Sequence, residues 1–143
     1  DLQAADSVQV TVGLGGTVVH FDGITWSDLP SNTQASLNGV WCRPEGEVIV
    51  VGADGLTLHG SGSGPTPWQV LSSGTVFPLF AVTGTQDGTA YAVGQSGVVL
   101  RNEGQAWELL PTGEHDQLDA IAVDPCGGVH TVGYWSLILG YAD

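Results

Sequence analysis

An all-β fold built from repeated four-stranded units is predicted by three features of the sequence. First, a Val-Gly pair followed three residues later by Gly or Ser recurs at a period of about 40 residues. Second, segments around these pairs, such as "EVIVVG" and "TAYAVG", are short, glycine-bounded and rich in β-branched and aromatic residues, which is typical of strands. Third, 22 glycines and 7 prolines in 143 residues favour many tight turns over long helices. The recurring pairs are Val12-Gly13, Val51-Gly52, Val93-Gly94 and Val132-Gly133.

Each complete unit is predicted to hold four strands, named A to D in chain order. Strand A is of the "LFAV" type, B of the "AYAVG" type, C of the "VVLR" type and D of the "AWELL" type. The first unit is predicted to begin at strand B ("VQVTVG") without a strand A, and the last to stop before a strand D. The units then hold three, four, four and three strands. Their approximate bounds are 1–35 (incomplete), 36–77, 78–116 and 117–143 (incomplete).

The pattern within the strands indicates how the units pack. Strands A and B are almost continuously apolar, as expected when both faces of a sheet are covered. Units with a period near 40 residues that stack face to face are typical of a β-propeller. The sequence therefore predicts a partial ring of about three and a half blades. The recurring glycines are expected to supply the positive φ of tight B–C turns. Tryptophans at the start of strand D are expected to fill space between blades; they are Trp26, Trp68 and Trp107.

The repeats resemble a known group of proteins. "LNGVWCRPEGEVIVVGADGLTLH" and "LFAVTGTQDGTAYAVGQSGVVLRNEGQAW" are similar to repeats of secreted bacterial β-propellers related to the Asp-box (bacterial neuraminidase) repeat and to photosystem II assembly-factor propellers. Asn102, Gly104 and Trp107 keep the Asp-box spacing, whereas Asp22 lies one residue late. The resemblance implies a propeller fold, a structural role for the Asp-box and a location outside the cytoplasm, extracellular or periplasmic. It does not imply one activity.

An incomplete ring predicts a partner. Terminal blades with uncovered apolar faces favour association, and propellers commonly have four to eight blades. Three arrangements stay open: a second copy completes the ring, another polypeptide supplies the missing blades, or the chain is a fragment of a longer protein. A self-contained four-bladed ring is disfavoured because one blade would lack its inner strand.

Composition excludes several partners. Fifteen carboxylates face two arginines, Arg43 and Arg101, and no lysine, for a net charge of −13 with histidines neutral. This charge disfavours nucleic acid and anionic membranes as partners, and no apolar run is long enough for a membrane span. Cys42 and Cys126 are two free thiols or, less favoured, a disulfide, and without matching histidines they form no zinc site. No motif indicates a cofactor; calcium stays open without a motif for it.

Catalysis is not indicated. The three-arginine cluster implied by neuraminidases cannot be built from two arginines. Asp22, Asp54 and Asp87 each precede glycine, which is ordinary turn chemistry. No nucleophile elbow, P-loop or His-Glu-x-x-His motif is present. The sequence thus predicts a non-catalytic binding or assembly scaffold, and the alternative is a carbohydrate-binding or glycosidase-related propeller with a glycan partner.

A binding surface is predicted where B–C and D–A loops gather on one face of a propeller. The fourth B–C turn carries Tyr134 and Trp135, where the other turns have small residues. The D–A loop entering the same blade brings Glu114, His115 and Asp116 to the same face. These five residues either bind a ligand or pack against a partner blade.

A second, weaker candidate is a recurring basic column. His20, His59 and Arg101 each lie seven residues after a repeat glycine, whereas His130 is expected in the core. The column either forms a ring of donors or consists of strand-end side chains bonded to a neighbouring loop. The second interpretation is favoured.

Overall fold

A computed structural model describes residues 2–5, 8–61, 68–104, 106–113, 115–124, 126, 128–133 and 138–141. Regular structure in these residues consists of β-strands and three single 3₁₀ turns. The strands are β1 (Leu2–Ala5), β2 (Val8–Val12), β3 (Val18–Phe21), β4 (Trp26–Asp28), β5 (Leu37–Cys42), β6 (Glu47–Gly52), β7 (Thr57–Ser61), β8 (Gln69–Leu71), β9 (Leu79–Gly84), β10 (Ala90–Gly94), β11 (Val99–Asn102), β12 (Trp107–Leu110), β13 (Leu118–Val123), β14 (Val129–Gly133) and β15 (Ile138–Tyr141). The turns are η1 (Leu14–Gly16), η2 (Ala53–Gly55) and η3 (Gln95–Gly97).

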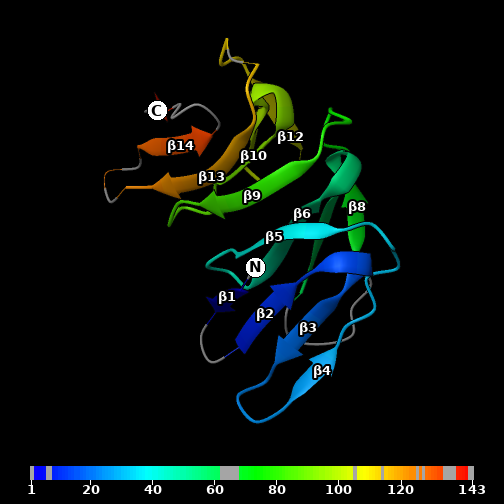
Figure 1. Ribbon diagram of the computed structural model, residues 1–143. Coiled ribbons are helices and arrows are strands. Elements are labelled where there is room, and N and C mark those ends of the chain that lie inside the picture. The colour runs from blue at the N-terminus through cyan, green and yellow to red at the C-terminus, as the bar shows by residue number, and fades with distance from the viewer. Residues whose placement is uncertain are drawn as a thin grey trace.

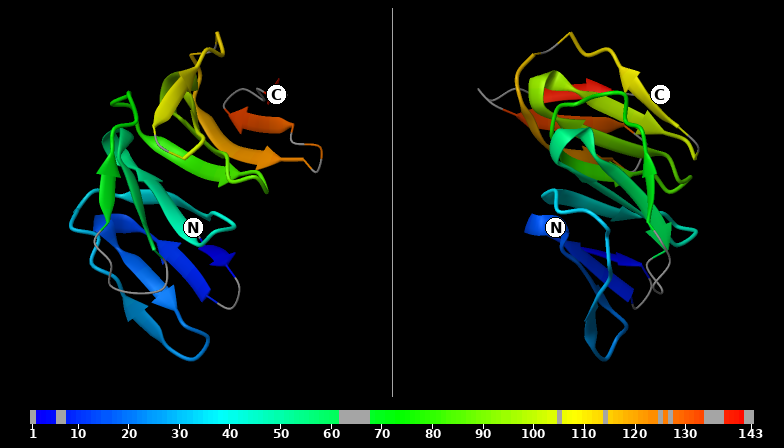
Figure 2. Two further views of the ribbon diagram at one scale, coloured as in Figure 1. Left: turned by 180° about the vertical axis from the view of Figure 1, so that it is seen from behind. Right: turned by 90° about the vertical axis from the view of Figure 1, so that its right-hand side faces the viewer.

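The strands form four antiparallel sheets whose spatial order follows the chain. Blade 1 is β1–β4, blade 2 is β5–β8, blade 3 is β9–β12 and blade 4 is β13–β15. The inner strands β1, β5, β9 and β13 contact one another in succession. Figure 1 places blade 1 and blade 4 at opposite ends of the row, and both views in Figure 2 show the same separation. The predicted all-β fold of four-stranded propeller blades is confirmed.

Blade 1 contains one strand more than the sequence predicted. β1 pairs with β2 in antiparallel register, from Leu2 opposite Thr11 to Ala5 opposite Val8, so the expectation that this blade lacks its inner strand was wrong. The segment "LQAA" was not predicted as a strand because it has no β-branched residue. It also lacks the Leu and aliphatic pair that begins strand A in the other units.

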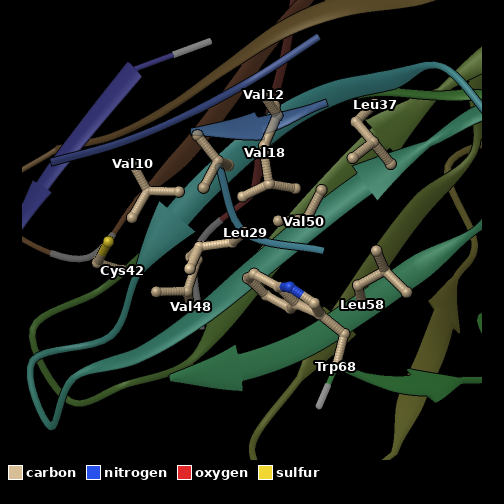
Figure 3. Close-up of a cluster of buried hydrophobic side chains, with 11 residues drawn as sticks. Val10, Val12, Val18, Leu29, Leu37, Cys42, Val48, Val50, Leu58 and Trp68 are labelled. Carbon is tan, nitrogen blue, oxygen red and sulfur yellow. The ribbon is translucent and has the colours of Figure 1, made fainter. Parts of the chain in front are cut away.

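Buried clusters between consecutive blades form the core. Each blade has a leading face, toward the next blade in the chain, and a trailing face, toward the preceding one. Val10, Val12 and Val18 on the leading face of blade 1 pack against blade 2, and Figure 3 shows the Trp68 indole within this cluster. A second cluster joins Trp41, Ile49 and Val51 of blade 2 to blade 3, and a third joins Val93 of blade 3 to Leu118 of blade 4. Because strand residues alternate sides, both faces of an inner blade are apolar.

Each B–C connection in blades 1 to 3 is a 3₁₀ turn with two consecutive residues at positive φ. In η2 these are Asp54 (φ 58°) and Gly55 (φ 74°). The equivalent pairs are Gly15-Gly16 and Ser96-Gly97. The positive φ expected of glycine in these turns is confirmed at Gly16, Gly55 and Gly97. The glycine before each turn is instead extended, with φ near −164° at Gly52. Gly52 allows its backbone to lie close to the Ser36 carbonyl, because a Cβ at this position would be 2.3 Å from the Ser36 carbonyl oxygen.

The tryptophans at the start of strand D pack against the preceding blade. Trp68 belongs to the cluster between blades 1 and 2, and Trp107 to the cluster between blades 2 and 3. Trp26, which is in blade 1, is 51% exposed and stacks on Phe21 at a centroid distance of 4.8 Å. The core position expected for Trp26 was wrong, because no described blade lies in front of blade 1 to cover it.

Candidate functional site

The B–C turns and D–A loops form one continuous surface, which we call the loop face. Hydroxyl groups of the D–A loops hold the turns: Ser31 Oγ donates to the Gly16 carbonyl at 2.6 Å, and Thr112 Oγ1 donates to the Gly97 carbonyl at 3.0 Å. Backbone hydrogen bonds tie each turn to the loop that enters its blade. The Ala53 amide donates to Ser36 O at 2.9 Å, and the Gln95 amide donates to Pro78 O at 3.0 Å. The loop face is therefore fixed by bonds within and between its segments.

Two of the five predicted site residues lie on the described part of this face. His115 and Asp116 are both exposed in the D–A loop between β12 and β13. Glu114, Tyr134 and Trp135 lie outside the described residues. The grouping of all five remains a prediction.

An open depression with two exposed apolar side chains on the loop face was missed by sequence reasoning. It lies in the D–A loop between β8 and β9, has a volume of about 420 Å³ and is open to solvent. Val76 is 77% exposed and Phe77 is 41% exposed. The lining residues are Ser72, Gly74, Thr75, Val76 and Phe77. The signal that could have found it is "TVFP", two apolar residues in a loop directly before proline.

Local hydrogen bonds fix the shape of the loop that lines the depression. Ser73 Oγ accepts from the Thr75 amide at 3.3 Å, and Thr75 Oγ1 accepts from the Phe77 amide at 3.2 Å. Gly74 between them has φ 81°, which favours glycine. Side-chain bonds of this kind stabilise a turn without a helix or sheet. Phe77 is thus presented by a loop of fixed shape.

The basic column occupies contacts between strands and blades. Arg101 Nη2 donates to Glu108 Oε2 at 3.0 Å on the neighbouring strand. His20 is buried, and its Nε2 has no hydrogen-bond partner among the described residues. His59 is buried between blades 2 and 3. His130, expected in the core, is exposed, because no described blade covers that side of blade 4.

The tautomer of His59 follows from its two partners. The Trp107 indole Nε1–H, which can only donate, lies 3.2 Å from His59 Nε2, so Nε2 is the acceptor. Nδ1 then carries the proton and donates to Glu47 Oε1 at 3.0 Å. Burial lowers the pKa of His59, although Glu47 acts in the opposite direction. The imidazole is therefore held neutral as a bridge between blades.

Arg43 makes the densest set of polar contacts between blades. The guanidinium is buried and bonds to Glu47 within blade 2. It crosses to blade 3, where Nε donates to the Gly88 carbonyl at 2.8 Å and Nη2 donates to Asn102 Oδ1 at 2.6 Å. Asn102 Oδ1 also accepts from the Gly104 amide at 2.8 Å. The Asp-box residue Asn102 thus serves both its own turn and the neighbouring blade.

The acids that precede glycine shape turns. Asp22 Oδ1 accepts from the amides of Ile24 and Thr25, both at 2.8 Å, and these bonds lower its pKa. Hydrogen bonds from Thr85 and then the Thr89 amide lower the pKa of Asp87. Their turn role is confirmed for these two residues.

Within the described residues, no group of three or more His, Cys, Asp or Glu side chains is arranged to hold a metal ion. None of the helical segments there is long and apolar enough to cross a bilayer. Cys42 is buried and Cys126 exposed, and both are free thiols. Burial raises the pKa of Cys42 to about 11.

The fold and the loop face define the class of the protein: a segment of a β-propeller. A solved structure described as YCF48 bound to D1 peptide matches it with a TM-score of 0.74 and 18% sequence identity. That likeness covers 99% of this chain and 49% of the other, so this chain spans about half its length. The immune protein Tsi7 of Pseudomonas aeruginosa is 34% identical over 71 residues, which are 50% of this chain and 22% of that protein. No family model matches the sequence.

Proposed function

We propose that the chain is a non-catalytic binding and assembly scaffold whose loop face takes a polypeptide. The observation that carries the proposal is the pair of exposed apolar side chains, Val76 and Phe77, at an open depression on a loop that hydrogen bonds hold in place. The likeness to a propeller described with a bound peptide supports the same kind of ligand.

The chemistry of the loop face favours a peptide that combines an apolar anchor with positive charge. Leu14, at the tip of the first B–C turn, is 78% exposed and adds apolar area to the same face. Asp54 and Asp116 are exposed on it, and the chain as a whole carries a net charge of −13. A basic ligand would be attracted by this field, and more strongly at low salt. We include Glu114, His115, Tyr134 and Trp135 in the proposed surface.

The polypeptide ligand can be tested by selecting short peptides from a library and measuring their affinity. Phe77→Ser should weaken the selected peptide at least tenfold, since it removes an exposed aromatic anchor. Leu109→Ser is the matched control, because Leu109 is also exposed but lies on the outer strand β12. Equal loss in both variants, or no loss in Phe77→Ser, contradicts the proposal.

Assembly is the second half of the proposed function. We propose that the ring is completed by a second copy or by another polypeptide, and that the chain works outside the cytoplasm, as the resemblance to secreted propellers suggests. The carbohydrate-binding and glycosidase alternatives have no specific observation in their favour. A glycan array with the same protein preparation tests them beside the peptide library.

A further inference from the structure

The last sheet leaves one face uncovered. Ala120 and Ala122 of β13 pair with Val132 and His130 of β14, so these four side chains lie on one side of blade 4. All four are exposed, and Val132 is 43% exposed. Val129, which points to the other side, is buried toward blade 3. The uncovered side is the leading face of blade 4.

Equivalent positions in the preceding blades are fully covered. Counted back from the repeat glycine, Val132 and His130 correspond to the first and third residues before Gly52 and Gly94. Those residues are at most 2% exposed because the next blade lies on them; they are Val51, Ile49, Val93 and Tyr91. The repeat therefore places an uncovered interface on blade 4.

The surface on blade 4 has the chemistry of a packed sheet. Three of its four side chains are Ala, Ala and Val, which leave room for a closely approaching sheet. The fourth, His130, has its Nε2 at 2.9 Å from Asp124 Oδ2 at the edge of the face. An apolar sheet face made mainly of small side chains packs against another sheet better than against a charged or extended ligand.

The complementary face lies at the other end of the molecule. On blade 1, Val10, Val18 and His20 point toward blade 2, so the alternate residues Thr11, Val19 and Phe21 point away. These three are only half-buried. Leu58, which holds the position of Val19 in blade 2, is 1% exposed. This is the trailing face of blade 1.

We propose that the leading face of blade 4 docks on the trailing face of blade 1 of a second copy, and that two such contacts close a ring of two chains. All three interfaces within the chain join a leading face to a trailing face, so the new contact continues an existing one. Two copies of four sheets give eight blades, within the usual range. The inference rests on the assembly half of the proposed function and selects one of its two partners.

The first measurement is the solution mass by light scattering at micromolar concentration. The 143-residue chain should have twice its 14.7 kDa mass. Ala122→Glu on the leading face and Val19→Glu on the trailing face should each halve the mass, because every contact in a head-to-tail ring needs both faces. Ala106→Glu, at an exposed loop alanine, is the matched control and should stay dimeric.

Mixing the two variants distinguishes head-to-tail docking from symmetric pairing. Ala122→Glu keeps an intact trailing face and Val19→Glu an intact leading face, so the mixture should form a one-to-one dimer joined by a single contact. Pairing of two leading faces would instead leave Val19→Glu dimeric alone and give no mixed species. That result overturns the inference, as does a monomeric wild-type chain.

Folding is controlled by circular dichroism of each variant. If Val19→Glu does not fold, Thr11→Glu replaces it on the same face. Binding of the selected peptide is measured on the same samples. A monomeric chain that still binds peptide contradicts the ring and leaves the loop face intact, whereas a dimer without peptide binding does the reverse.

Discussion

At the scale of single residues, the interface between blades 2 and 3 depends on polar contacts as well as on apolar packing. Arg43 is buried in a chain that has only two arginines and no lysine, and it bonds to groups of both blades. His59 links the same blades through the Trp107 indole. Both residues hold one sheet in register with the next, and neither touches the loop face.

Removal of the Arg43 guanidinium should destabilise the fold. Arg43→Met keeps much of the apolar stem but removes the Arg43 donor to the Gly88 carbonyl and one of the two donors to Asn102 Oδ1. Loss of one partner from a buried charged network costs about 3 kcal/mol. Arg101→Met is the matched control and should cost about 1 kcal/mol or less, because its partners Glu103 and Glu108 are exposed. Urea unfolding measures both, and equal losses contradict a special role for Arg43.

The stability of the fold should depend on pH through His59. Burial lowers the pKa of His59 in the folded chain, so the unfolded chain takes up the proton first as the pH falls. Stability is therefore full above about pH 6.5, the ordinary histidine value, and is lost as pH falls from there through the folded pKa. His59→Gln, which does not titrate, should flatten this loss in denaturant midpoints measured from pH 8 to 5. An unchanged pH profile contradicts the assignment.

At the scale of elements, the recurring glycine before each B–C turn is explained by close approach of two strands. A Cβ atom at Gly52, Gly94 or Gly133 would lie 2.3, 2.1 or 1.9 Å, respectively, from the carbonyl oxygen of the residue before the inner strand. Gly13 has the same extended backbone but no atom within 4 Å. The difference follows from β1, which pairs with β2 only as far as Thr11.

Two alanine substitutions separate these cases. Gly94→Ala should destabilise the fold by about 2 kcal/mol or more, since the methyl group and the Pro78 carbonyl cannot occupy the same space. Gly13→Ala should change stability by only about 0.5 kcal/mol, because the new methyl group meets nothing. Thermal or urea unfolding of both variants checks the contrast. A large loss in Gly13→Ala would show that the backbone conformation, not the contact, requires glycine.

The elements differ in how far the sequence predicts them. The blade frame was predictable because apolar columns and turn glycines recur in register. β1 was not, since its short segment carries no strand signal of its own. Trp26 and His130 were misplaced because burial at their positions depends on a neighbouring blade, which no local pattern describes. The Arg43–Asn102 bond joins residues 59 positions apart, beyond the reach of any motif.

The candidate site, like the elements, was predictable only where it follows from the repeat pattern. The loop face as a class of surface followed from the order of strands, and His115 and Asp116 are exposed there. The apolar pair in "TVFP" is a sequence signal for the depression around Phe77, whereas the prediction rested on the aromatic residues of the fourth B–C turn. The shape of this loop depends on hydrogen bonds to Ser73 Oγ and Thr75 Oγ1, which no sequence pattern specifies.

At the scale of the whole molecule, the row of blades has two unlike ends. Blade 1 presents a trailing face with Val19 and Phe21, and blade 4 presents a leading face with Ala120, Ala122 and Val132. Unlike ends that fit each other generate closed rings or open chains of subunits, depending on the rotation at each contact. The proposed ring of two chains is the closed form, so the mass should stay at twice that of the chain as concentration increases, whereas a mass that keeps growing would indicate open chains and contradict the ring.

Every contact between blades joins a leading face to a trailing face, and this rule affects how such a chain can evolve. Because every blade offers the same pair of faces, duplication of one cassette of about 40 residues adds a blade without requiring a new kind of contact. Deletion of a cassette brings two old surfaces together in the same way. Blade number can therefore change by recombination within a gene while the packing rule is inherited unchanged, and new specificity then needs only substitutions in the loops.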